Sequence, residues 1–139
     1  MVEYRLLAAG EFDVEEHIKE LAAWIEIPVD ITEIEQGWMA IATDPDFEIH
    51  LRELPDSDYK SRYDLPLKYE ITLSDNQELV MKVVDEWRHA NPASFVLMAD
   101  NRTVAMRRTR VIFFNMDEFI EFDEIFDSFI ASDFLQYGG

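Results

Sequence analysis

Histidine is the side chain of this sequence best suited to acid–base or metal chemistry, because imidazole titrates near neutral pH and is a common metal ligand. The chain contains three histidines, His17, His50 and His89. Their surroundings show neither an HxH nor an HExxH spacing, and the local patterns place them on a helix, a strand and a helix end. We therefore interpret each as an exposed or hydrogen-bonded structural residue.

Carboxylates are a second source of chemistry, because pairs of them act as general acid and base and clusters of them bind Ca²⁺ or Mg²⁺. The chain has 30 acidic residues against 12 lysines and arginines. Their densest run, 117–127, lacks the alternating acids of an EF-hand loop and shares a helical pattern with Phe119, Phe122, Phe126 and Phe129. A solvent-facing helix surface explains this run better than a metal site, and we predict no bound metal.

No motif for covalent catalysis or nucleotide binding is present. Cysteine is absent, and no serine lies in a Gly-x-Ser-x-Gly turn. The four glycines are too widely spaced for a Walker loop or a dinucleotide fingerprint. We predict that the protein is not an enzyme and needs no cofactor. The enzymatic alternative that remains is a site assembled by the fold from His50 and distant carboxylates.

The one basic cluster, Arg107, Arg108 and Arg110, lies in a β-rich run. On an ideal strand Arg108 and Arg110 point to one side and Arg107 to the other. Either a bulge near 107–109 re-aims these side chains, or the cluster lies on the solvent face of a sheet. The arginines could pair internally with the surplus acids, or they could contact an acidic segment of a partner or of a second subunit.

The contact interpretation predicts that truncating all three arginines to alanine weakens association and leaves the monomer folded. Tryptophan and tyrosine combine apolar area with a polar atom, which suits an interface as well as a core. The aromatic candidates for the same contact are Trp87, Phe134 and Tyr137.

The elements that position these residues belong to one domain, 1–139. A length of 139 residues is close to the commonest domain size, and 48% hydrophobic residues supply an ample core. This outweighs the disorder that a net charge of −18 would otherwise favour. The absence of cysteine excludes disulfides and fits a reducing compartment.

Charge and hydropathy limit the partners and the location. A net charge of −18 repels phosphate backbones and anionic lipid surfaces, so we expect no nucleic-acid partner and no membrane partner. Charged residues interrupt every apolar stretch before it reaches the roughly 18 residues of a membrane span. The N-terminus has no basic region of the secretory kind. We expect a soluble, cytoplasmic protein.

The first half of the chain predicts a helix and then strands. Apolar residues recur at helical spacing over 14–25, behind a capping box made by Asp13 and Glu16. Alternation then predicts strands at 38–43 and 47–53 around an Asp-Pro-Asp turn. The second of these strands has an apolar face, Phe47, Ile49 and Leu51, and a polar face, Glu48, His50 and Arg52. A further strand is expected at 29–35, and a polar loop at 55–66.

The second half predicts a further strand, a helix, a hairpin and a final helix. A strand at 67–73 has Leu67, Tyr69, Ile71 and Leu73 on one side. A helix follows, with start signals at 74–78 and a stop at Asn91-Pro92.

A hairpin of 94–99 and 103–114 follows, and then a final helix from Asn115, with 138–139 frayed at the end. The element order is roughly α-β-β-β-(β)-α-β-β-α. Because strands and helices do not alternate as βαβ units would, we predict the α+β class, with an antiparallel sheet covered by helices.

The run Val83-Val-Asp-Glu-Trp-Arg-His-Ala-Asn91, followed by 95–100 and 104–106, resembles the YbjN-like branch of the type III secretion chaperone-like fold. The resemblance covers roughly 67–134. It implies a small acidic cytoplasmic bacterial protein without a cofactor, frequently a homodimer. It transfers no binding residue to this chain.

Together these observations favour a non-enzymatic protein-binding domain, chaperone-like or regulatory, acting as a homodimer. Its partner would be another protein or its own second subunit. The alternative is an acidic inhibitor or immunity-type protein that blocks a basic partner, for which strongly salt-sensitive binding is expected.

Overall fold

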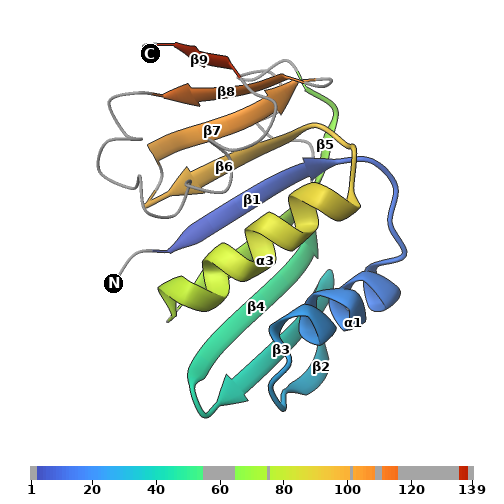
Figure 1. The fold of residues 1–139 in the computed structure, drawn as a ribbon. Helices are drawn as coiled ribbons and strands as arrows, with labels where there is room; N and C mark the ends of the chain where they lie inside the picture. Colours follow the sequence, from blue (N-terminus) through green and yellow to red (C-terminus); the bar gives the residue numbers. More distant parts are fainter. Residues whose placement is uncertain are drawn as a thin grey trace.

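The computed structural model describes residues 3–54, 65–74, 76–100, 102–108, 111–115 and 135–137. Within them the chain forms two helices and nine strands (Figure 1). The helices are α1 (Val14–Ile25) and α3 (Gln77–Ala90). The strands are β1 (Tyr4–Ala9), β2 (Asp30–Ile34), β3 (Gly37–Thr43), β4 (Asp46–Glu53), β5 (Leu67–Ser74), β6 (Phe95–Ala99), β7 (Arg102–Arg108), β8 (Val111–Asn115) and β9 (Leu135–Tyr137).

The strands form a single sheet in the order β2-β3-β4-β5-β1-β6-β7-β8-β9. Neighbouring strands are antiparallel, except that β8 and β9 run parallel. The first strand of the chain, β1, lies in the middle of the sheet between β5 and β6. The prediction of an α+β domain with helices over an antiparallel sheet is confirmed.

Each helix begins at a side-chain cap. Asp13 Oδ1 accepts a 3.2 Å hydrogen bond from the backbone N–H of Glu16, as the capping-box pattern predicts. Asn76 Oδ1 accepts a 3.1 Å bond from the N–H of Leu79. The second helix therefore starts after Asn76 and not at the earlier serine and aspartate signals.

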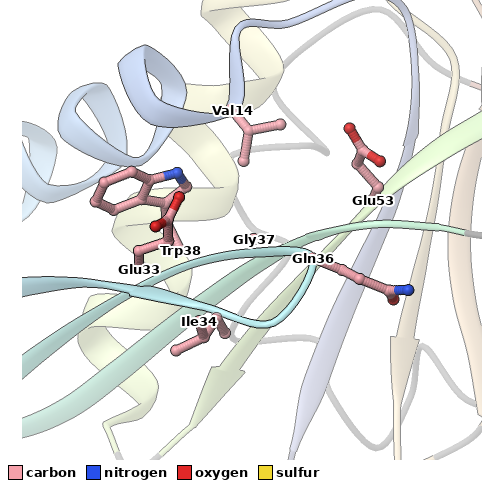
Figure 2. A pocket seen from close by; sticks show the side chains of 7 residues that line it. All are labelled: Val14, Glu33, Ile34, Gln36, Gly37, Trp38 and Glu53. Atoms are coloured by element: carbon pink, nitrogen blue, oxygen red, sulfur yellow. The ribbon is translucent and has the colours of Figure 1, made fainter.

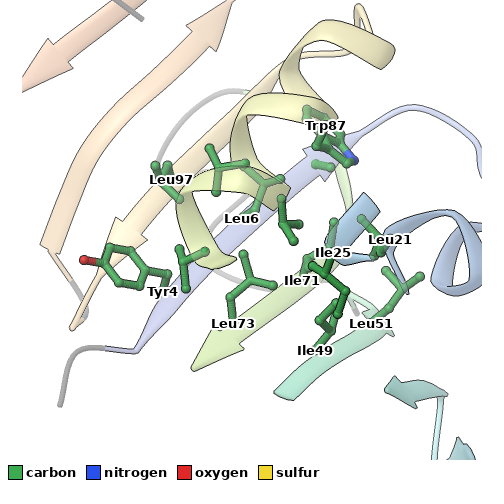
Figure 3. Packing of buried hydrophobic residues seen from close by; sticks show 14 of the residues in the cluster. Tyr4, Leu6, Leu21, Ile25, Ile49, Leu51, Ile71, Leu73, Trp87 and Leu97 are labelled. Atoms are coloured by element: carbon green, nitrogen blue, oxygen red, sulfur yellow. The ribbon is translucent and has the colours of Figure 1, made fainter. Parts of the chain in front are cut away.

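Both helices cover the same face of the sheet (Figure 1), with α1 packed over β3 and β4 and α3 over β5. Figure 3 shows Leu21 and Ile25 of α1 meeting Ile49 and Leu51 of β4 in the core between them. All four side chains are almost wholly removed from water. Burial of such apolar area is the main stabilising term of the fold.

The second part of the central strand β1, residues 6–9, is buried on both of its faces. Leu6 and Ala8 face the helix-side core, whereas Leu7 joins a smaller cluster with Leu65, Leu67, Val96 and Met98. A strand buried on both faces has a continuous apolar sequence rather than an alternating one. Leu67 was expected on the same side as Tyr69, but the register of β1 and β5 shifts between Ala8 and Ala9, and Leu67 packs in the second cluster.

Several element boundaries differ from the sequence prediction. No strand was predicted at β1, because its apolar run does not alternate. The single strand expected over 103–114 is two strands, β7 and β8, that pair with each other. The polar loop ends where it was expected, since β5 starts at Leu67, although Leu65 within it is buried. The rest of that loop, 55–64, the helix expected beyond Asn115 and the end 138–139 lie outside the described residues.

Among the described residues, neither helix combines the length and the apolar character that a membrane crossing demands.

Candidate functional site

The face of the sheet opposite the helices carries a band of polar side chains. In β4 the apolar residues Phe47, Ile49 and Leu51 enter the helix-side core. Because side chains alternate along a strand, Glu48, His50 and Arg52 lie on the opposite face. The predicted two-faced character of this strand is thereby confirmed.

The register of the sheet aligns these side chains in rows. His50 pairs with Thr72 of β5, and Thr72 pairs with Arg5 of β1. Arg52 pairs with Glu70 in the next row. The band lines a hollow of about 340 Å³, which we call the open-face hollow. Its lining residues are Glu3, Arg5, Glu48, His50, Arg52, Glu70, Thr72 and Ser74.

Charges of opposite sign alternate in the open-face hollow. Arg5 Nε donates to Glu3 Oε1 at 3.3 Å. His50 Nε2 lies 3.6 Å from Glu48 Oε1, and these two groups form an ion pair only when His50 is protonated. The side chains of Arg5 and His50 are 29% and 24% exposed. Ion pairs in such wet surroundings contribute little to stability, so these groups can exchange their present partners for those of a ligand at small cost.

The hollow provides a base but no aligned nucleophile among the described residues. His50 beside Glu48 has the composition of an oriented base. The hydroxyl of its cross-strand neighbour Thr72 donates to Glu70 Oε1, 3.4 Å away, and not to His50. The enzymatic alternative required titratable groups that converge in a concave site, and the open-face hollow has them. That alternative therefore remains a hypothesis.

Metal binding finds no support within the described part of the chain, where no three His, Asp or Glu side chains are grouped to hold an ion.

Arg107, expected at a partner contact, is instead an interior residue that is 8% exposed. Its guanidinium donates to backbone carbonyls at the end of α3: to Arg88 O at 3.0 Å, to Ala93 O at 2.8 Å and to Asn91 O. The last carbonyls of a helix lack partners within the helix. Arg107 therefore caps α3 from the neighbouring strand β7.

Burial lowers the pKa of Arg107 to about 10, with a smaller contribution from the charge of Arg88. The guanidinium remains protonated at neutral pH. Its central carbon lies 5.0 Å from the centre of the Phe95 ring and 5.9 Å from that of Trp87, within the range of cation–π attraction.

The prediction that Arg107 and Trp87 contact a partner is thus wrong, because both side chains are buried. Arg107 faces the helices because it pairs with Phe95 of the core, and Trp87 is 0% exposed. Arg107 also pairs with carbonyls and not with the surplus acids. The register irregularity of β7 lies opposite Leu97 and Met98, several residues before the expected bulge.

The remaining contact candidates are untested by the structure. Arg108 ends β7 and Tyr137 ends β9. Arg110 and Phe134 lie outside the described residues.

Trp87 forms part of a buried polar contact that joins the two helices. Its Nε1–H donates to His17 Nε2 at 3.1 Å, so His17 carries its own proton on Nδ1. The imidazole stacks on the Phe12 ring, with the ring centres 4.3 Å apart. His17 is a satisfied structural residue, as the sequence interpretation held.

The burial of His17 predicts that stability depends on pH. Burial lowers the pKa of His17, and Glu20, whose Oε1 lies 3.8 Å from Nδ1, offsets only part of this effect. In the unfolded chain His17 therefore becomes protonated near pH 6.5, whereas in the folded chain it remains neutral to a lower pH. The contribution of neutral His17 is present above about pH 6.5 and should be lost as the pH falls below that value.

Urea unfolding at pH 7.5 and at pH 5.5 measures this dependence. His17→Gln should reduce the difference in unfolding free energy between the two pH values. His89→Gln is the matched control, because the side chain of His89 is 60% exposed, and it should retain the dependence. If the wild type and both variants showed the same change in unfolding free energy between the two pH values, the pH dependence would come from the carboxylates and not from His17.

Sequence reasoning did not single out Arg5, Thr72 or Glu70 as site residues. Each is one polar position in an alternating or apolar run, and only the pairing of β1, β4 and β5 brings them together. The signal in the sequence was the polar face of β4, but the sequence did not show which residues of other strands lie beside it.

Comparisons with protein-family models, with curated proteins and with solved structures find no match to this chain.

Proposed function

We propose that this protein is a non-enzymatic protein-binding domain, chaperone-like or regulatory, that acts as a homodimer and holds an extended segment of its partner in the open-face hollow. The observation that supports this proposal best is the hollow itself. Both described helices lie on the other face of the sheet, so neither of them covers the rows of charged and hydroxyl groups.

The surroundings of the hollow also suit a protein partner. Met39 pairs with His50, and Ile41 pairs with Glu48, so two half-buried apolar side chains of β3 extend the polar rows. A polar array beside apolar side chains matches the mixed composition of protein interfaces. Alternating charges favour a segment of complementary sequence over a uniformly charged polymer.

Peptide selection tests the proposal. A display library of random strand-length peptides is selected against the purified protein, and the selected peptides are titrated by calorimetry. Replacing both Arg5 and Arg52 with alanine should weaken binding at least about tenfold, because charged partners across an interface are removed. The control variant, Lys19→Ala with Lys68→Ala, loses two cations from exposed ion pairs outside the hollow and should change affinity less than about twofold.

Two results would contradict the proposal. One is the absence of reproducible peptides, and the other is binding that ignores the hollow substitutions. Basic peptides that bind regardless of those substitutions, and that dissociate at high salt, would support the acidic inhibitor or immunity-type alternative. Sedimentation of the same protein at micromolar concentration should show a dimer. A strict monomer would remove the homodimer from the proposal.

A further inference from the structure

A second pocket lies where the start of α1 meets the β2–β3 turn, and we call it the corner pocket. Its volume is about 260 Å³, just below the range that holds a drug-sized ligand. A single long side chain suits this size better. Figure 2 shows the indole of Trp38 next to Glu33, with Val14 of α1 above them and Glu53 at the other end of the pocket.

The walls combine an aromatic ring with two carboxylates. Trp38 and Glu33 are directly opposite each other on β3 and β2, which places the carboxylate beside the indole. Glu53 belongs to β4, and its backbone N–H donates to Gln36 O in the β2–β3 turn. Neither carboxylate forms an ion pair within the described part of the chain, and both residues are exposed.

We infer that the corner pocket binds an arginine side chain presented by a partner protein. The flat guanidinium stacks on the Trp38 ring by cation–π attraction and donates to the carboxylate of Glu33 beside it. Glu53, at the other end of the pocket, adds negative charge that attracts the cation. Val14 supplies apolar surface for the methylene stem. A lysine has a compact ammonium that stacks less well and makes no forked hydrogen bond.

The electrostatic surroundings favour a cation despite the helix start nearby. The first backbone N–H groups of a helix carry partial positive charge. In α1 these groups are offset by the capping carboxylate of Asp13 and by Glu15 and Glu16 in the first turn. The overall charge of −18 further raises the local concentration of cationic partners.

The inference does not depend on the open-face hollow, since Trp38 packs against the helix-side core and the hollow lies on the opposite face. It is tested by NMR titration of the isotope-labelled protein with a blocked Gly-Arg-Gly peptide. A Gly-citrulline-Gly peptide is the matched probe, because citrulline has nearly the same shape without the charge. The arginine peptide should shift the indole N–H of Trp38 and the amides of β2 and β3, and it should bind at least about tenfold more tightly than the citrulline peptide.

The carboxylates are tested by the double substitution Glu33→Gln and Glu53→Gln, which should weaken binding of the arginine peptide at least about tenfold. Asp46→Asn with Glu86→Gln removes the same charge from exposed sites elsewhere and should change binding less than about twofold. Three results would overturn the inference. They are equal affinity for the two peptides, equal loss in the two double variants, and shifts spread over the surface away from the pocket.

Discussion

Replacing Arg107 with methionine should destabilise the folded state by about 3–5 kcal/mol, because several carbonyls lose charge-assisted hydrogen bonds and each unsatisfied buried group costs roughly 1–3 kcal/mol. Methionine keeps apolar volume near Phe95 but removes every donor, so the carbonyls of Arg88, Asn91 and Ala93 lose the hydrogen bonds that now end α3. Thermal and urea unfolding measure the loss. For a domain of this size the midpoint should fall by roughly 10 °C or more.

Two further variants separate the capping role from the loss of a charge. Arg107→Lys keeps the charge but replaces the fork by one ammonium group, so its stability should be intermediate. Lys82→Met removes a cation from α3, where Lys82 Nζ lies 3.4 Å from Glu26 in an exposed pair, and should cost less than about 1 kcal/mol. If Arg107→Met and Lys82→Met were equally stable, Arg107 would not be a cap. The sequence predicts that the triple arginine-to-alanine variant weakens association while the monomer stays folded. Because that variant also removes the Arg107 cap, it should destabilise the monomer and cannot test association alone.

Gly37→Ala should destabilise the protein by about 3 kcal/mol, at the upper end of the range for overpacking. A Cβ at Gly37 would lie 2.0 Å from the backbone oxygen of Leu51 and 2.9 Å from the Cα of Arg52. Backbone atoms cannot swing aside as a flexible side chain can, so β3 and β4 must separate. Urea unfolding measures the loss in stability.

The control for Gly37→Ala is Thr43→Ala at the exposed far end of β3, where the change should stay within about 0.5 kcal/mol. The hydrogen-exchange rates of the β2 and β3 amides should rise in Gly37→Ala and remain unchanged in Thr43→Ala. Wild-type stability and exchange in Gly37→Ala would show that the close approach of the two strands is not required.

Local sequence signals were enough for most elements. The capping box at Asp13 predicts the start of α1, and alternation along β4 predicts which of its residues are buried. Both depend on residues a few positions apart, whose geometry is set by the period of a helix or strand. The α+β class followed from the order of such elements. The same local reasoning failed for β1. Its short apolar run indicates burial on two faces but fits a buried strand and a buried helix segment equally well.

The amino-acid sequence alone determined that α1, α3 and the β3–β4 hairpin form, because propensity, capping and turn chemistry act within a few residues. Only the tertiary structure decided that β1 is the central strand, that Arg107 is buried as a helix cap, and that Arg5 and Thr72 share a row with His50. These outcomes depend on which strands pair and in which register. Strand pairing joins residues that are distant in sequence, and no local pattern encodes the partner.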